Sequence, residues 1–354
     1  MNELDRLPIP LLEWYRDNAR ALPWRPAPGS RTLGDPYRVW VSEIMLQQTR
    51  VAAVLEYYQR FMAALPTVEA LAAVEEDRLM KLWQGLGYYT RARNLRKAAQ
   101  QITGACGGRF PDTYEGLLAL AGVGEYTAGA IASIAFGAPV PAVDGNVLRV
   151  VSRLTADEGD IARPETKKRM RSALQAVMPR QDPGDFNQAM MELGATVCLP
   201  NGAPRCEVCP AGGFCRARRE ERTGQLPVKA AKKARRTERR TVYLIFHGDA
   251  AALRRRPDRG LLAGLWEYPN QPGGGLEQLA EWGIVPRSVE PVGVGKHVFS
   301  HIEWHMEALA VEAEEAALPE GWVWADRAGL HGTYAVPSAF QSFAKTVERR
   351  LQGE

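Results

Sequence analysis

The chain has 354 residues, 45% of them hydrophobic and 24% charged, and a formal net charge of +4. This length and composition predict a globular protein of two domains and exclude a low-complexity or fibrous chain. The first residues, MNELDRLPIPLLEWY, contain no apolar core of signal-peptide length, and the longest uncharged run, 126–143, is broken by Gly137, Pro139 and Pro141, so we expect a soluble, cytoplasmic protein without a membrane partner.

The positive charge is concentrated in one segment. Residues 216–240 hold eleven Lys or Arg and three Glu, a net charge of +8, so the rest of the chain carries −4. Such a run can attract a polyanion such as a nucleic acid, or it can be a solvated linker. Both interpretations can hold at once.

Residues 1 to about 225 show helical periodicity, and no clear strand is indicated before residue 240. Within 35–65, Asp35 can cap a helix that has Pro36 at its first position, and a boundary or bend can fall further along. Glu43 follows in the apolar stretch WVSEIML. Burial would raise its pKa and suit it to a general acid, whereas the alternative is a surface glutamate on an amphipathic helix.

Gly122 and Gly124 separate two predicted helices, 113–120 and 126–136. They permit a tight turn whose backbone N–H groups point outward where the second helix begins, which is an arrangement that can seat a phosphate. A dinucleotide-binding fold is not indicated, because no strand precedes the glycines and the third glycine of that motif is missing. The alternative is a plain helix hairpin.

Asp144, in VDGNVLRVVSRL, stands where a further helix begins. The helix dipole favours an ionised carboxylate at that end, although a simple N-cap would need the same residue. One acid that donates a proton and one carboxylate that stays charged are the pair needed to break a glycosidic bond. Glu43 and Asp144 make this chemistry possible, but their spacing does not demonstrate it.

Four of the five cysteines lie within eighteen residues: Cys198, Cys206, Cys209 and Cys215. In a cytosolic protein such a cluster predicts a metal site rather than disulfides. Spacing alone does not separate a [4Fe–4S] cluster from structural zinc, because both accept four thiolates.

After residue 240 the pattern changes to that of strands, in TVYLIF, LWEYP and 297–313, with short helices at 275–283 and 338–351. If 297–313 is one continuous strand, alternation places one set of polar and aromatic side chains on a single face: His297, Phe299, His301, Glu303 and His305. One strand rarely supplies a closed metal site, so we expect no metal there. We therefore predict an α domain over 1–225, a basic connector over 226–240 and an α+β domain over 241–354.

Together these features resemble the helix-hairpin-helix, iron–sulfur DNA glycosylases of the endonuclease III superfamily, and within it the MutY family of adenine DNA glycosylases. The motifs that carry the resemblance are LPWR, VSEIMLQQTRV, GLGYYTRARNL, GVGEYTAGAI, VDGNV, FNQAMMELGA and the cysteine cluster. GLLAGLWEYP and HVFSHIEWH resemble the family's Nudix-like C-terminal domain. The resemblance implies an all-α helix-hairpin-helix glycosylase domain with a [4Fe–4S] cluster in the loop 198–215, and an α+β Nudix-like domain that recognises 8-oxoguanine.

The resemblance also implies an enzyme of base excision repair. It would act as a monomer on double-stranded DNA and remove adenine opposite 8-oxoguanine or guanine. Glu43 would be the general acid and base, and Asp144 would stabilise or attack the oxocarbenium-like sugar, with Tyr126 and Asn146 orienting the groups. Bifunctional relatives carry a lysine at the place of Tyr126, and because a phenol cannot form a Schiff base, the resemblance implies a monofunctional glycosylase.

Binding residues follow from the same resemblance. Trp24, Arg25 and Gln188 match the adenine pocket, where the Gln188 amide can bond the adenine edge in two places. Gly122 and Gly124 would grip the phosphates beside the flipped nucleotide. Two further groups surround the oxidised guanine: Gln48, Thr49, Leu86 and Tyr88 would enter the base stack, and Phe299, Ser300 and His301 would form a sensing loop.

The sensing loop conflicts with a continuous strand through the same residues, so one of these two predictions is wrong locally. A Nudix hydrolase would also need a glutamate-rich helix after GLWEYP to hold magnesium, and QPGGGLEQLAEWG lacks it. We therefore expect no nucleotide hydrolysis.

Two alternatives stay open. A thymine or uracil mismatch glycosylase of the same superfamily would keep Asp144 and the cysteine cluster and could carry Tyr126, but it would usually lack the second domain. A non-catalytic DNA-binding repair scaffold would bind through the hairpin and the basic connector, and Glu43→Gln would leave its function intact.

Overall fold

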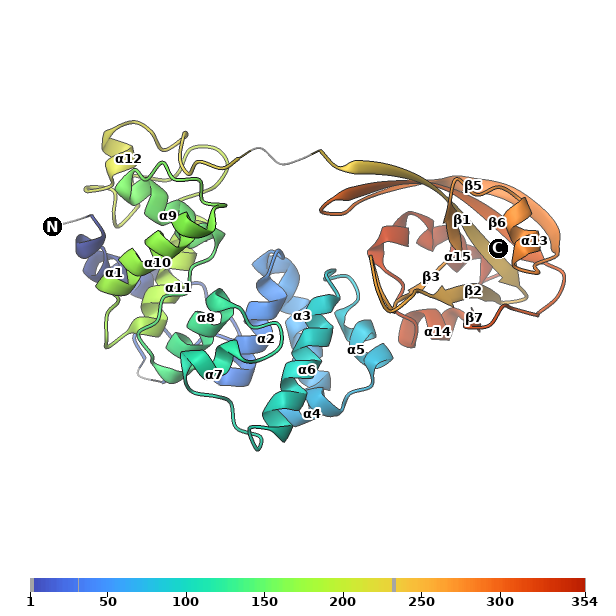
Figure 1. The fold of residues 1–354 in the computed structure, drawn as a ribbon, viewed down its shortest axis with the longest axis horizontal. Helices are drawn as coiled ribbons and strands as arrows, with labels where there is room; N and C mark the ends of the chain where they lie inside the picture. The colour runs from blue at the N-terminus through green and yellow to red at the C-terminus, as the bar shows by residue number, and fades with distance from the viewer. Residues whose placement is uncertain (1–2, 31, 231–233, 354) are drawn as a thin grey trace. The chain divides into compact units, whose positions relative to one another are not determined.

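The computed structural model describes residues 3–30, 32–230 and 234–353. The chain divides into two compact units (Figure 1). The first unit comprises residues 1–73 and 94–231, and the second comprises 74–93 and 232–354. The described residues of the first unit are helical and form no strand, whereas the second unit is built on a β-sheet.

In the first unit, the predicted helix starts at Pro36 and after Asp144 and the predicted helix 126–136 agree with the observed helices. In chain order they are η1 (Leu4–Arg6), α1 (Pro8–Asn18), α2 (Pro36–Leu46), α3 (Val51–Ala64), α4 (Val68–Ala73), α6 (Thr90–Gly104), α7 (Tyr114–Leu118), α8 (Glu125–Phe136), α9 (Gly145–Thr155), α10 (Pro164–Val177), α11 (Pro183–Thr196) and α12 (Arg216–Arg219). The boundary between the two units falls within α6. Asp35 caps α2 by accepting a hydrogen bond from the Arg38 N–H at 3.0 Å, as predicted.

Two packing features of the first unit position its site. Helices α1, α9, α10 and α11 share a core that includes Leu11, Val151 and Phe186. Helix α8 is buried from Thr127 to Ala135, because its small side chains let neighbouring helices approach closely. Tyr126 lies in the first turn of α8 and is half-buried. The break expected within 35–65 lies between α2 and α3, where Gln48 adopts a left-handed conformation (φ 63°).

The second unit contains α5 (Glu76–Trp83) and a sheet that has seven strands in its described residues. The strands are β1 (Arg236–His247), β2 (Ala250–Arg255), β3 (Trp266–Glu267), β4 (Asn270–Pro272), β5 (Pro286–Val298), β6 (Ile302–Ala313) and β7 (Trp322–Ala325). Their order is β3-β2-β1-β6-β5, with β4 paired to β1 and β7 paired to β2. β1 starts at Arg236, earlier than the predicted start after residue 240, because 236–240 pair in parallel with 302–306 of β6.

Both faces of the sheet carry an apolar cover. One core packs Val242, Leu244 and Trp304 against η2 (Ser338–Phe343) and α15 (Ala344–Arg350), with α14 (Arg327–Gly332) beside them. The opposite core packs Tyr243 and Ile245 against α13 (Glu277–Glu281). This alternation along β1 is the period of two that the sequence predicts for a strand buried on both sides.

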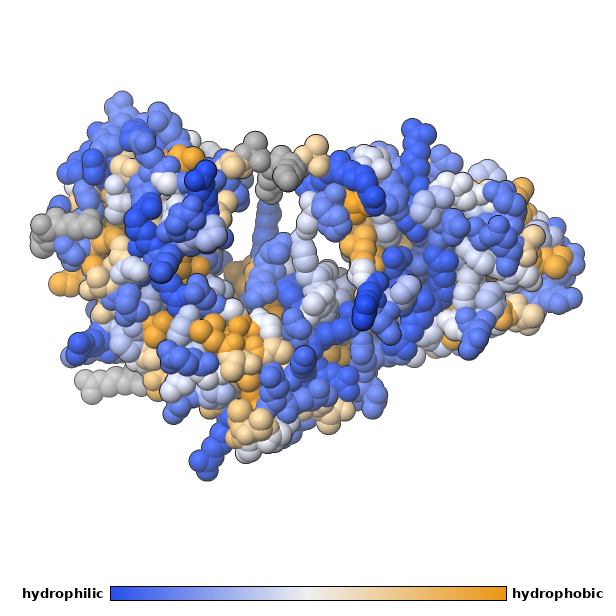
Figure 2. Space-filling model, in the orientation of Figure 1, coloured by the Kyte–Doolittle hydropathy of each residue, from blue (hydrophilic) through white to orange (hydrophobic). Residues whose placement is uncertain are grey.

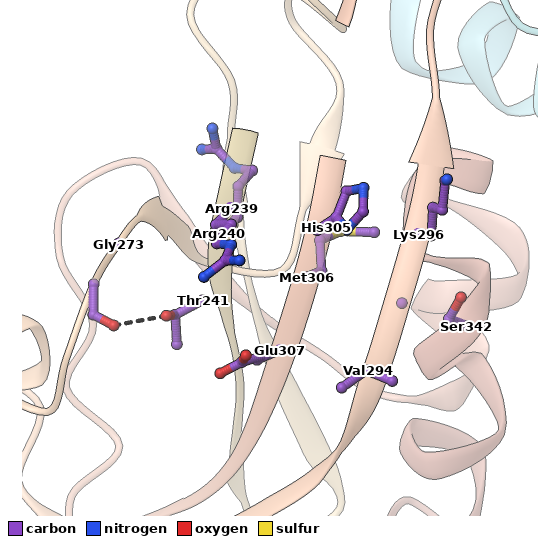
Figure 3. Close-up of a pocket in the computed structure, with 12 residues that line it drawn as sticks. Arg239, Arg240, Thr241, Gly273, Val294, Lys296, His305, Met306, Glu307 and Ser342 are labelled. Carbon is purple, nitrogen blue, oxygen red and sulfur yellow. Dashed lines mark hydrogen bonds between the residues drawn. The ribbon is translucent and has the colours of Figure 1, made fainter. Parts of the chain in front are cut away.

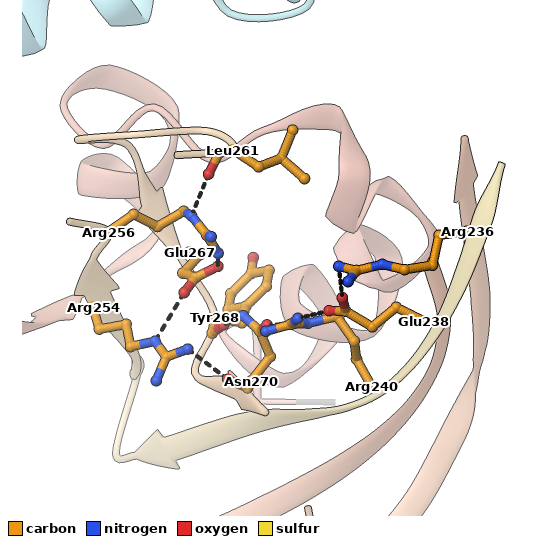
Figure 4. Close-up of polar contacts among 9 residues, drawn as sticks. All are labelled: Arg236, Glu238, Arg240, Arg254, Arg256, Leu261, Glu267, Tyr268 and Asn270. Carbon is orange, nitrogen blue, oxygen red and sulfur yellow. Dashed lines mark hydrogen bonds and ion pairs between the residues drawn. The ribbon is translucent and has the colours of Figure 1, made fainter. Parts of the chain in front are cut away.

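A network of charged side chains lies beside the first of these cores (Figure 4). Glu267, 1% exposed, accepts hydrogen bonds from Arg254 Nε at 2.9 Å and Arg256 Nη1 at 2.5 Å. Arg240 Nε donates to Asn270 Oδ1 at 2.7 Å. The buried carboxylate therefore has two cationic partners, as burial of a charge requires.

The continuous strand predicted over 297–313 is wrong. β5 ends at Val298 and β6 begins at Ile302, and the Phe299 N–H closes the turn by donating to the Ile302 carbonyl at 2.8 Å. Within β6 the predicted alternation holds, since Trp304 is buried and His305 is exposed. Val298, which a continuous strand would place on the face opposite His297, is 45% exposed because it is the last residue before the turn.

Among the helices of the described ranges, none is long and apolar enough to cross a membrane. The face of the molecule drawn in Figure 2 is mostly hydrophilic, with apolar residues in small groups.

Candidate active site

One cavity of the first unit, with a volume of about 920 Å³, gathers most of the residues that the sequence analysis singled out. Its walls come from residues 20–25, α2 and the turn after it, the first turn of α8, the start of α9, and α11. The predicted residues that line it are Trp24, Arg25, Glu43, Gln48, Thr49, Tyr126, Asp144, Asn146 and Gln188. The fold therefore brings together the carboxylates and the adenine-pocket residues, which are up to 164 positions apart in the sequence.

Glu43 is buried, with 5% of its surface exposed, so it is not the surface glutamate of the alternative interpretation. Its Oε2 accepts a hydrogen bond from the Tyr126 hydroxyl at 2.5 Å. Burial raises the pKa of Glu43 to about 7; the Tyr126 hydrogen bond opposes this rise and the nearby Asp144 charge adds to it. A carboxyl group with this pKa is half protonated near neutral pH, where it can both donate and accept a proton.

Tyr126 holds its proton. Burial and the neighbouring carboxylates Glu43 and Asp144 raise the pKa of its phenol well above the ordinary value. Met191 Sδ lies 3.1 Å from the hydroxyl on the side of α11. The phenol is therefore a fixed donor to Glu43.

Asp144 caps α9 and also lines the cavity, so the N-cap is confirmed and is compatible with the functional role that the resemblance implies. Its Oδ1 accepts from the Val147 N–H and its Oδ2 from Asn146 Nδ2, each at 2.8 Å. Arg149 Nη2 donates to Asn146 Oδ1 at 2.9 Å, which fixes the orientation of that amide. Burial raises the pKa of Asp144 and these hydrogen bonds lower it, with a net rise. The hydrogen bonds at the helix terminus therefore offset part of the rise that burial causes in the pKa of Asp144.

The predicted adenine pocket forms the α11 side of the cavity. Gln188 is 4% exposed, and among the residues that the structure describes its side chain forms no hydrogen bond. Trp24 packs edge-on against Tyr58 with ring centroids 4.9 Å apart. Arg25 Nη1 forms an ion pair with Glu192 Oε2 at 3.1 Å.

Glu192 is a residue that the sequence analysis missed. Its carboxylate is 1% exposed, lines the cavity and also accepts from Arg20 Nε at 2.5 Å. Its two cationic partners lower its pKa despite burial, so it stays ionised at neutral pH. The available signal was an acidic residue within the otherwise apolar AMMELGA.

The Gly122–Gly124 turn lies between α7 and α8, and its two glycines differ. Gly122 has φ 73°, and a Cβ there would lie 2.6 Å from the Cβ of Asn94, so the position excludes larger residues. Gly124 is the N-cap of α8, and a Cβ there would meet no atom within 4 Å. An exposed start of a 12-residue helix, open above Gly124, fits the phosphate seat that the sequence predicts.

The remaining predicted DNA-contact residues lie in the second unit. Tyr88, 49% exposed and left-handed at φ 47°, approaches Ser300 with its hydroxyl 3.1 Å from Ser300 Oγ. Phe299 packs on Trp304, with ring centroids 4.9 Å apart, whereas Ser300 and His301 are exposed in the turn between β5 and β6. Leu86 is only 6% exposed, so of the two predicted wedge residues in this loop only Tyr88 presents its side chain.

The second unit also contains a groove of about 810 Å³ that the sequence did not indicate (Figure 3). Arg239 of β1, His305 of β6 and Lys296 of β5 pair in register and form one row across its floor. Glu303 partly neutralises this row, because it accepts from Lys296 Nζ at 2.8 Å and contacts His305 Nε2 at 2.6 Å.

The four clustered cysteines line one small cavity beside Arg153, whose Nη1 lies 3.3 Å from Cys198 Sγ. As placed, no three His, Cys, Asp or Glu side chains of the described residues form a group that could hold a metal ion. The donor set nevertheless suits an iron–sulfur cluster, because four thiols converge on one cavity and a guanidinium can offset the charge of their thiolates. Burial raises the pKa of Cys209 to about 12, so its ionisation requires a positive charge of the kind that a metal centre supplies.

Comparisons with known proteins agree with this arrangement. The family described as "HhH-GPD superfamily base excision DNA repair protein" matches residues 41–179, and the NUDIX domain matches 241–346. The adenine DNA glycosylase of Mus musculus is 37% identical over 89% of this chain and 72% of its own length, and that of Homo sapiens is 36% identical over 97% and 73%. The solved structure of a thermostable thymine-DNA glycosylase is 26% identical and superposes with a TM-score of 0.54, covering 62% of this chain and 97% of that protein.

The helical domain with its cavity, the second domain of the Nudix type and these identities over most of both chains agree with one another. The chain belongs to the adenine DNA glycosylase family, whose members are glycosylase enzymes of base excision DNA repair.

Proposed function

We propose that this protein is a monofunctional, monomeric glycosylase that excises adenine opposite 8-oxoguanine or guanine in double-stranded DNA. The observation that carries the proposal is the buried pair of Glu43 and Tyr126 in the same cavity as Asp144. A carboxyl group with a pKa near 7 can act as an acid and then as a base within one turnover.

The proposed reaction begins when adenine leaves the duplex and enters the cavity. Protonated Glu43 donates its proton to N7 of adenine, and the C1′–N9 bond then breaks with its electrons passing to the base. Asp144 stabilises the positive charge that develops on the sugar, or attacks C1′ to form a transient covalent intermediate. The ionised Glu43 finally accepts a proton from the water that adds to C1′, which restores the starting state.

The neighbouring side chains support these steps. Asn146 fixes the Asp144 carboxylate, and the Tyr126 hydroxyl fixes Glu43. The Gln188 amide, which has no partner among the described residues, can pair with the edge of adenine, and Trp24 can pack on the base. Arg25, already paired with Glu192, adds positive charge at the cavity wall.

In this proposal, two sets of residues recognise the base opposite adenine. Gln48 and Thr49 lie on the turn after α2, and Tyr88 with Ser300 and His301 forms an exposed group in the second unit. An aromatic wedge such as Tyr88 suits a base stack, since stacking contributes about 1–3 kcal/mol per base. Gly122 and Gly124 would hold the phosphates beside the flipped nucleotide.

Cys198, Cys206, Cys209 and Cys215 would hold the [4Fe–4S] cluster. When bound, the cluster would supply a rigid cross-link for the loop 198–215, which packs on the core formed by α1, α9, α10 and α11. No step of the proposed reaction passes through it.

Single-turnover excision on three duplexes tests the proposal: adenine opposite 8-oxoguanine, adenine opposite guanine, and thymine opposite guanine. We expect strand breaks only after alkali, fastest for adenine opposite 8-oxoguanine. Cleavage of the thymine duplex alone would move the protein to the mismatch-glycosylase alternative, to which the thymine-DNA glycosylase likeness gives some weight. Breaks without alkali would mean that an amine acts as a lyase and that the assignment of Tyr126 is wrong.

A further inference from the structure

Helix α5 and the loop after it, residues 74–93, pack in one compact unit with residues 232–354, although they stand in the middle of the helical part of the sequence. Polar side chains hold the segment there. Lys81 Nζ donates to the Leu330 carbonyl at 2.6 Å and to the Tyr334 carbonyl at 3.1 Å. Gln84 Nε2 donates to the Val336 carbonyl at 2.7 Å.

One of these three hydrogen bonds reaches a carbonyl at the end of a helix. Leu330 belongs to the last turn of α14, whose carbonyls have no partner within the helix. An ammonium group at a helix C-terminus is favoured by the helix dipole as well. Lys81 is half-buried, and burial lowers its pKa, so its place against these carbonyls is not that of a freely solvated lysine.

The loop that follows Gln84 is held at its other end too. Trp83 Nε1 donates to the Gly87 carbonyl at 3.1 Å, and Arg91 Nη2 donates to the carbonyls of Leu86 and Gly87 at 3.1 and 3.2 Å. These bonds fix the backbone on which Tyr88 stands in its left-handed conformation. The Tyr88 hydroxyl then lies 3.1 Å from Ser300 Oγ.

We propose that Lys81 and Gln84 are positioning residues for the discrimination of 8-oxoguanine from guanine. They anchor α5 to the backbone of residues 330–336, so that Tyr88 and Ser300 meet the opposite base as one fixed element. This inference rests on the proposed function, because it assumes that Tyr88 and Ser300 contact the base opposite adenine. Neither anchoring residue touches the DNA in this proposal.

The test uses the full chain carrying Lys81→Met and Gln84→Leu, which remove the donors and keep most of each apolar side-chain stem. The measured quantity is the ratio of single-turnover excision rates for adenine opposite 8-oxoguanine and adenine opposite guanine. We expect this ratio to fall about tenfold, the size expected for losing one or two hydrogen bonds, while the rate opposite guanine changes by less than about twofold. Lys345→Met, an exposed lysine of α15, is the matched control.

Two further measurements separate positioning from a general loss of structure. Lys81→Arg keeps a cation that can donate to two carbonyls. When it replaces Lys81→Met, the ratio of the two excision rates should return most of the way to the wild-type value. Tyr88→Phe combined with the double variant should lower the ratio no further than the double variant does alone, because residues that act as a unit are not additive.

The outcomes are distinct. A double variant that keeps the wild-type ratio, or loses both rates in parallel, overturns this inference and leaves the proposed function standing. A fall in the ratio that Lys81→Arg does not restore, or that Tyr88→Phe deepens, also overturns it. A wild-type protein that excises adenine equally well opposite both bases overturns this inference and the expected preference for 8-oxoguanine, whereas a wild-type protein that excises adenine from neither duplex overturns the proposed function.

Discussion

Glu43 should reduce the stability of the folded protein at neutral and alkaline pH, and its replacement should reveal by how much. Burial raises its pKa from the ordinary 4.5 to about 7. The folded state therefore keeps a proton that the unfolded state loses between these two pH values. The free energy of unfolding should fall as the pH rises through this window and level off above about pH 7, by a total of about 3 kcal/mol.

Glu43→Gln removes this titration and keeps an oxygen that can accept the Tyr126 hydrogen bond. Urea unfolding of wild type and variant at pH 5 and pH 8 measures the effect, with Glu115→Gln on the exposed side of α7 as a matched control. Between the two pH values the variant should gain about 2–3 kcal/mol relative to wild type. Parallel pH dependence of the two proteins would refute the buried, proton-holding carboxyl on which the proposed mechanism depends.

The same variant should lose excision while it gains stability. General acid–base catalysis contributes about 10²–10⁴-fold, so single-turnover excision should fall by that factor while binding of the duplex is retained. Wild-type excision should decline as the pH rises above about 7, because the proton donor is lost. A variant that binds and excises normally would support the non-catalytic scaffold instead.

Five other substitutions test four separate parts of the structure. Tyr126→Phe removes a hydrogen bond that lowers the pKa of its carboxyl partner, so the alkaline limb of the pH–rate profile should move to higher pH. Gly122→Ala should cost about 1–3 kcal/mol in thermal unfolding, because it strains a left-handed residue and meets a neighbouring side chain, whereas Gly124→Ala has open space and should cost much less. Cys209→Ser should yield protein with less bound iron and weaker visible absorption than wild type; equal iron content would contradict the cluster assignment. Glu267→Gln should destabilise the second unit by about 1–3 kcal/mol, since it leaves two half-buried guanidinium groups without their carboxylate partner, and an unchanged unfolding midpoint would contradict this.

Local sequence signals predicted the helical elements of the first unit well, because caps and periodicity act over a few residues. Asp35 and Asp144 cap helices as expected, and the break after α2 lies inside the segment where a bend was allowed. The turn between β5 and β6 could not be located from alternation alone. Both strands have the same period and His297 through His305 shows no glycine or proline, so only the resemblance pointed to a loop at Phe299.

The site depended on a different kind of information. That Glu43 is buried follows from the packing of α2 against α8, which no spacing within α2 encodes. The ion pairs of Arg20 and Arg25 with Glu192 could not be predicted from the sequence either, because an ion pair between residues more than 160 positions apart leaves no local pattern. The family motifs supplied Glu43 and Arg25 as residues to be tested, but they did not single out Arg20 or Glu192.

Residues 74–93 show why an apolar period does not reveal where a helix packs. The apolar side chains of α5 recur with a period that suits any apolar neighbour, so the sequence gives no reason to separate α5 from the helices around it. Its partners are instead backbone carbonyls at Leu330, Tyr334 and Val336, and any residue type can supply a carbonyl. Because Tyr88 follows directly on this helix, the geometry of a proposed DNA contact depends on bonds made some 250 residues away along the chain.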